Sequence, residues 1–105
     1  MTAYEIEQND KQGSVKLMGD LTAVLVPDLQ TGLKQMLNGG TSEVVFDLAK
    51  TAMLDSSGIG LLIAAANSLA RSGGKVRVTN VSPDILRLLQ SMRLVGRLNV
   101  TGRTE

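Results

Sequence analysis

The sequence predicts an α/β fold: a single domain with a mixed, mainly parallel sheet of about four or five strands, an N-terminal hairpin and helices packed against the sheet. First, short segments with the two-residue period of strands alternate with segments of helical period, in the order β-β-α-β-α-β-α-β. Second, strands separated by helices pair in parallel through right-handed crossovers. Third, 105 residues suit one domain, which is expected to span residues 1–105.

The first third of the sequence predicts a hairpin followed by a helix. Apolar and charged residues alternate from Tyr4 to Gln8, a turn-forming segment follows over 9–13, and the alternation returns over 15–17. Helical spacing begins near Pro27, which suits the start of a helix because its missing N–H costs least there. The apolar stripe of this helix contains Val26, Leu29, Leu33 and Met36, and Asn38, Gly39 and Gly40 end it.

The middle of the sequence predicts a central strand and a buried helix. Residues 44–48 are almost continuously apolar, which is typical of a strand that is covered on both faces. The apolar run over 61–66 is too long for a strand and therefore indicates a helix, which is expected to end at 72–74.

The last third predicts a strand, a helix and a short edge strand. The strand covers 75–79, and Ser82 and Pro83 provide a hydroxyl cap and a first-turn proline for the helix. Gly96 is expected to end this helix, and 98–101 to add the edge strand. The inward stripe of the helix is expected to contain Ile85, Leu88, Leu89 and Met92.

Composition excludes several kinds of chemistry. The chain has neither histidine nor cysteine, so it lacks disulfides, thiol nucleophiles, Ser-His-Asp triads and zinc sites built from these residues. Its acidic residues show no calcium-loop spacing, and no metal or cofactor is expected. The sequence shows no apolar run of membrane-spanning length and no signal segment, so we expect a cytoplasmic protein without membrane insertion.

Charge is unevenly distributed along the chain. Residues 1–70 contain four basic and eight acidic residues, whereas residues 71–105 contain seven basic and two acidic ones. The basic residues are scattered, and Tyr4 and Phe46 are the only aromatic residues on which bases could stack. We therefore expect no nucleic-acid partner. The pattern contains no large apolar seam, so a monomer is expected.

The segment Leu54–Gly60 lies where a buried strand hands over to a buried helix, which is a common location for binding sites in α/β sheets. One interpretation is that its Asp-Ser-Ser sequence simply caps the helix. A second is a nucleophile elbow, but Leu54 and Gly58 stand where two glycines are needed, and the chain has no histidine to activate a serine. A third is a phosphorylation switch, because a helix N-terminus tolerates the added negative charge while a partner surface would not.

Four segments together resemble the STAS domain family, and within it the bacterial anti-sigma-factor antagonists. They are Gly19–Leu21, Met53–Gly60, Arg71–Lys75 and Val81–Pro83. The resemblance extends from about Tyr4 to Val100 and implies a single STAS domain.

The resemblance implies an interaction protein, not an enzyme. In that family the unmodified antagonist binds an anti-sigma factor that is also a serine kinase, and this binding frees the sigma factor. The kinase uses ATP and magnesium to phosphorylate the antagonist on the serine after the motif aspartate, and a PP2C-type phosphatase removes the phosphate. Phosphorylation releases the kinase.

Carried onto this sequence, the resemblance implies Ser56 as the phosphorylated residue, with Ser57 as the second choice. Asp55 would orient the loop, and Gly58 and Gly60 would leave room for a kinase active site. The expected partner contacts are Asp20, Thr22, Asp55, Ser56, Ser57, Gly58, Ile59, Asn67 and Arg71. The chain departs from the family at Thr22, where many phosphorylated members have an aspartate.

Two alternatives stay open at this stage. A STAS domain can also be the docking or regulatory subunit of a membrane transport complex, without control by a kinase. A nucleotide-binding loop is the other alternative, although the glycines match neither GxxxxGK[ST] nor GxGxxG.

Overall fold

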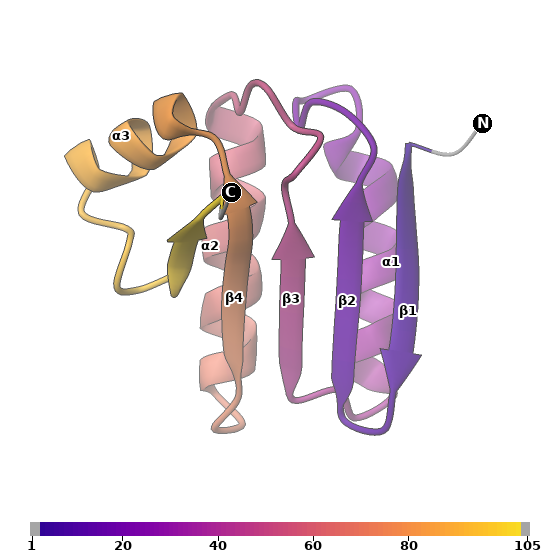
Figure 1. The fold of residues 1–105 in the computed structure, drawn as a ribbon. Coiled ribbons are helices and arrows are strands. Elements are labelled where there is room, and N and C mark those ends of the chain that lie inside the picture. Colours follow the sequence, from indigo (N-terminus) through magenta and orange to yellow (C-terminus); the bar gives the residue numbers. More distant parts are fainter. Residues whose placement is uncertain (1–2, 104–105) are drawn as a thin grey trace.

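The computed structural model describes residues 3–103, in which a five-stranded sheet carries three helices (Figure 1). The strands are β1 Tyr4–Asn9, β2 Gln12–Leu17, β3 Glu43–Asp47, β4 Lys75–Val81 and β5 Val100–Gly102. The helices are α1 Val26–Asn38, α2 Ser56–Ala70 and α3 Pro83–Ser91. This element order confirms the predicted fold. None of these three helices has both the length and the apolar character needed to cross a membrane.

The sheet follows the chain in the order β1-β2-β3-β4-β5, with an antiparallel first pair and parallel pairs thereafter. A turn at Asp10 and Lys11 connects β1 and β2, and Asp10 adopts a positive φ of 56°. Asparagine and aspartate tolerate this conformation better than other non-glycine residues do. Since β2, β3 and β4 run in parallel, the loops that follow them emerge at the same end of the sheet.

Helices α1 and α2 cover one face of the sheet and leave the other face open (Figure 1). Side chains that point toward the helices are fully buried, including Val15 on β2, Phe46 on β3 and Val78 on β4. Their neighbours along each strand point the other way, and Val45 between two buried residues is only half-buried. The prediction that the strand over 44–48 is covered on both faces is therefore wrong. The sequence of this strand is nearly continuously apolar because the outward-facing position 45 is also a valine.

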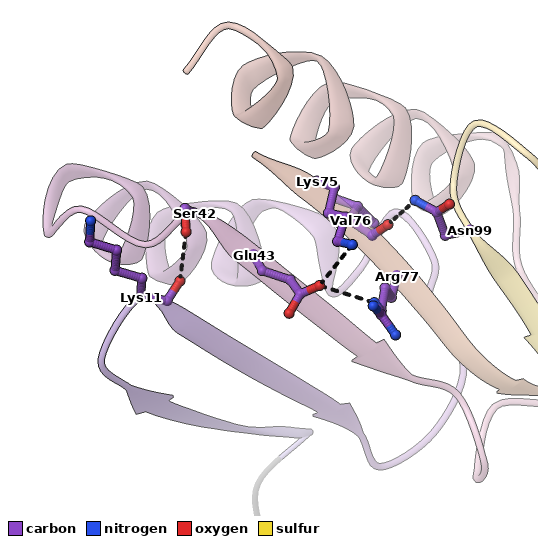
Figure 2. Close-up of polar contacts among 7 residues, drawn as sticks. All are labelled: Lys11, Ser42, Glu43, Lys75, Val76, Arg77 and Asn99. Carbon is purple, nitrogen blue, oxygen red and sulfur yellow. Dashed lines mark hydrogen bonds and ion pairs between the residues drawn. The ribbon is translucent and has the colours of Figure 1, made fainter. Parts of the chain in front are cut away.

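The open face is polar and carries a cross-strand ion-pair cluster, shown in Figure 2. The Glu43 carboxylate on β3 lies 3.0 Å from Nε of Arg77 and 3.7 Å from Nζ of Lys75, both on β4. Glu43 and Lys75 are direct neighbours in the parallel register. Two of the seven basic residues of the last third are thus already paired with an acidic residue of the first two thirds.

Helix α3 starts as predicted and ends earlier than predicted. The Ser82 hydroxyl accepts a hydrogen bond from the Ile85 N–H at 3.2 Å, which caps the helix. The helix ends at Ser91 because Arg93 adopts a positive φ of 59°, and the Leu94 N–H then donates to the Leu89 carbonyl at 2.9 Å. This is the left-handed C-terminal motif that glycine usually forms. Gly96 therefore does not end the helix.

The inward stripe of α3 is narrower than predicted. Ile85 and Leu89 are buried, whereas Leu88 and Met92 keep 37% and 46% of their surface exposed. The sheet ends beside α3 with the short strand β5, so the helix has too little surface beneath it to bury all four residues (Figure 1).

Candidate functional site

The candidate site is formed by two loops that lie side by side at the carboxyl end of the parallel strands. One loop leads from β2 to α1, and the other from β3 to α2 (Figure 1). Leu21 and Leu54 form an isolated parallel bridge between them. The Leu21 N–H donates to the Met53 carbonyl at 3.2 Å, and the Asp55 N–H donates to the Leu21 carbonyl at 3.3 Å. These bonds continue the parallel pairing of β2 and β3 up to the first turn of α2.

A carboxylate from each loop also holds the backbone of the other loop. Oδ1 of Asp20 accepts hydrogen bonds from the Ala52 and Met53 N–H groups, both at 3.0 Å. In return, Oδ2 of Asp55 accepts from the Ala23 N–H at 2.9 Å. Asp20 is therefore a structural residue of the site. Because its Oδ1 is already engaged, it does not simply replace the aspartate that the family often has at the position of Thr22.

Asp55 is also the N-cap of α2. Its Oδ1 accepts a hydrogen bond from the Gly58 N–H at 2.9 Å, so its two oxygens hold two backbone groups on different sides of the site. The Gly58 N–H, followed by the Ala23 N–H, lowers the pKa of the Asp55 carboxyl below its usual value of 3.8. Asp55 is therefore ionised at neutral pH and fixes the entry of α2, while its part in partner binding stays a prediction.

Ser56 is the first residue of α2 and is exposed, whereas Ser57 is half-buried. The cap of the helix is the Asp55 carboxylate, so the helix start does not depend on the Ser56 hydroxyl. Exposure is the property that a phosphorylated hydroxyl needs, and it ranks Ser56 above Ser57.

The two glycines of the segment have different roles. A Cβ on Gly58 would lie 2.4 Å from the Leu21 carbonyl oxygen, so this position requires glycine for packing. Gly60 is exposed, and a Cβ there would meet no atom within 4 Å. Only Gly60 therefore fits the prediction that glycine keeps the helix entrance open. Gly58 instead lets the β2–α1 loop approach α2.

Ile59 was predicted as a partner contact, and the structure contradicts this. Its side chain is 7% exposed and belongs to the hydrophobic core. The sequence pattern misled because α2 turns its first apolar residue toward the sheet immediately after the serines. Gly58 is likewise buried, so it supports the contact surface without forming part of it.

Asn67 on α2 and Arg71, the C-cap residue that follows the helix, are exposed but lie far from Ser56. At about 1.5 Å of rise per residue, they stand about 16 and 22 Å along the helix axis. Asn67 already accepts a hydrogen bond from the Arg97 guanidinium. The structure therefore does not bring these two residues into the loop cluster.

Thr22 is half-buried, and its carbonyl accepts hydrogen bonds from the Leu25 and Val26 N–H groups at the start of α1. Two apolar residues of these loops were missed in the sequence. Val24 is 93% exposed and Met53 is 53% exposed. Both lie in segments without helical or strand periodicity, so no pattern separated them from residues of the core.

The site contains no ready-made metal centre among residues 3–103. No group of three or more acidic side chains in this part of the chain converges on a point that could hold an ion. The carboxylates of Asp20 and Asp55 already accept hydrogen bonds from backbone N–H groups.

Replacing Asp55 by asparagine is expected to lower the melting temperature at pH 7, because a single amide oxygen cannot accept from both Ala23 and Gly58. The sign of the pH dependence follows from the lowered pKa. The stabilisation is present above pH 3.8 and is lost as the pH falls through the folded-state pKa. Thermal unfolding of both proteins from pH 7 to 2.5 tests this. Their melting temperatures should converge below pH 3.8, and a constant difference would contradict the assignment.

Known proteins resemble this chain in sequence. The family model "Mlab, STAS domain" matches residues 4–100. The anti-sigma-B factor antagonist of Staphylococcus aureus is 30% identical over 101 residues, which cover 96% of this chain and 94% of that protein.

Two solved structures show the same fold. The Thermotoga maritima protein TM1081 superposes with a TM-score of 0.85 at 16% identity, covering 92% of this chain and 84% of that one. The Bacillus cell fate determinant SpoIIAA, in its phosphorylated form, superposes with a TM-score of 0.79 at 22% identity, covering 98% and 93%. The chain belongs to the STAS domain family and is of the anti-sigma-factor antagonist type, a regulatory rather than an enzymatic kind of protein.

Proposed function

We propose that this antagonist works by phosphorylation-controlled partner switching, with Ser56 as the switch. The unmodified protein binds an anti-sigma factor that is also a serine kinase, and phosphorylation of Ser56 ends the complex. The observation that carries the proposal is the exposed Ser56 hydroxyl at the first position of α2, on a loop that Asp20 and Asp55 hold in place. The phosphorylated form in which the Bacillus SpoIIAA structure was determined supports it.

The chemistry belongs to the kinase. The Ser56 Oγ attacks the γ-phosphorus of ATP, the bond from that phosphorus to the β,γ-bridging oxygen breaks, and ADP leaves. The hydroxyl proton passes to a base of the kinase. Magnesium enters with the nucleotide. The antagonist contributes an exposed hydroxyl on a rigid loop, and a PP2C-type phosphatase returns it to the free serine by hydrolysis.

The fold can carry the phosphate while a complex cannot. At the N-terminus of α2 the dianion faces the positive end of the helix dipole, which offsets its repulsion from the neighbouring Asp55 carboxylate. In a complex the same dianion would be desolvated against the partner, which is costly unless a cation pairs with it. Phosphorylation therefore changes affinity without unfolding the protein.

Phosphopeptide mapping of the protein isolated from its native cells tests the proposal. The expected result is a single phosphate on Ser56, absent from Ser56→Ala and retained in Ser57→Ala. A phosphate on Ser57 alone would move the switch by one residue. Persistent absence of phosphate, together with co-purifying transporter subunits, would overturn the proposal in favour of a docking subunit of a membrane transport complex.

A further inference from the structure

We propose that Val24, with the hollow beside it, is a specificity contact for the anti-sigma partner, and that the hollow receives an apolar side chain flanked by a lysine or arginine. This inference rests on the proposed function and adds a second contact surface to the Ser56 loop. Its starting observation is that Val24 is 93% exposed, the highest value among the exposed large hydrophobic residues of residues 3–103. An apolar side chain in this position buries almost no surface in the folded protein, so it adds almost nothing to stability.

Val24 is held close to Ser56. It follows Ala23, whose N–H donates to the carboxylate of Asp55, the residue directly before Ser56. The Cα–Cα steps at both ends, the 2.9 Å hydrogen bond and the bonds of the Asp55 side chain add up to a separation of at most roughly 16 Å between the two Cα atoms. A protein interface of standard size covers about 800 Å² on each partner, which is wide enough to include both residues. A partner seated on Ser56 therefore reaches Val24.

The surface beside Val24 is a hollow of about 360 Å³. Met18 and Leu25 contribute apolar surface to it, and Asp20 and Asp28 contribute negative charge. None of the basic residues between positions 3 and 103 lines it. A side chain that fills the hollow is therefore apolar, and the charge beside it on the partner is positive.

Polar groups that could bind the partner are few at this point of the hollow. Thr22 lines the hollow and is neutral, and Oδ1 of Asp20 already accepts two hydrogen bonds from the β3–α2 loop. Without a free carboxylate at that point, burial of apolar area around Val24 is the stronger source of affinity here. Burying a valine side chain contributes about 1.5 to 3 kcal/mol when complete, which corresponds to roughly 10- to 100-fold in affinity.

The test first locates the contact in native cells by placing the photo-crosslinking residue benzoylphenylalanine at position 24 or, as a control, at position 92. Met92 is also an exposed apolar residue but follows α3 as its C-cap, away from the loops. Position 24 should crosslink to the serine kinase that phosphorylates Ser56, and position 92 should not. Crosslinks from position 24 to no protein, or to a protein other than a kinase of this class, would overturn the inference.

Affinity for that purified kinase is then measured by calorimetry. Val24→Ser is expected to bind about 10-fold more weakly, Val24→Ile to bind within about twofold of the wild type, and the control Met92→Ser to be unchanged. Asp28→Lys should bind more weakly and with a slower association rate. Wild-type affinity for Val24→Ser would overturn the inference.

The Ser56→Asp variant separates the two proposals. If it loses binding while Val24→Ser keeps it, the switch stands and the Val24 surface is wrong. If Val24→Ser loses binding while Ser56→Asp keeps it, the surface stands and the switch is wrong. Because Val24 is almost fully exposed, its substitution should leave the melting temperature unchanged, so lost binding cannot be attributed to unfolding.

Discussion

Ser56→Asp is expected to weaken binding of the anti-sigma partner about 30-fold or more, the largest effect on binding that a single substitution should have in this protein. A carboxylate at the exposed start of α2 would be desolvated in the complex without a cation to pair with, and an unpaired interfacial charge costs about 2 kcal/mol or more. Fluorescence anisotropy or calorimetry with the purified kinase measures the effect.

Two matched variants complete this experiment. Ser56→Ala should bind like the wild type but stay bound in the presence of ATP, because it has no hydroxyl to phosphorylate. Ser57→Asp places the same charge one residue further, on a half-buried side chain, and controls for a general effect of added charge. Equal affinities of Ser56→Asp and the wild type would remove Ser56 as the switch.

The elements of this fold were predictable where local chemistry decides them. The order of strands and helices, the hairpin and the start of α3 at Ser82 follow from periodicity, turn residues and capping preference. The end of α3 was not predictable in this way. It depends on Arg93 adopting a conformation that the sequence signal assigns to glycine, and the packing of Leu94 accompanies it.

The site was predicted in part for a similar reason. The Asp-Ser-Ser-Gly segment marked the loop, and Ser56 is exposed there, while its phosphorylation stays a prediction. The hydrogen bonds between the two loops join residues more than 30 positions apart in the sequence. The Asp20 carboxylate accepts from the Met53 N–H, and the Asp55 carboxylate accepts from the Ala23 N–H. No local pattern contains such a contact. The burial of Ile59 is likewise decided by the direction in which α2 leaves the loop.

Gly58→Ala is expected to reduce the free energy of unfolding by about 1 to 3 kcal/mol, the range found for overpacked cores. The added Cβ would lie 2.4 Å from the Leu21 carbonyl oxygen and 3.0 Å from the Leu21 Cγ, so the β2–α1 loop must move. That carbonyl also accepts the Asp55 N–H, so the movement loosens the cap as well as the packing. Urea denaturation measures the loss.

Gly60→Ala is the matched control. Both glycines lie in the first two turns of α2, but only a Cβ at position 58 would contact Leu21. With open space around its Cβ, alanine at position 60 should raise the free energy of unfolding by about 0.5 to 1 kcal/mol through helix propensity. If an open surface at Gly60 lets the kinase reach Ser56, this stabilised variant should nevertheless be phosphorylated more slowly. A stabilised variant with an unchanged phosphorylation rate would show that the kinase does not approach along that side of the helix. If Gly58→Ala and Gly60→Ala lost the same amount of stability, steric contact with Leu21 would not be the reason for glycine at position 58.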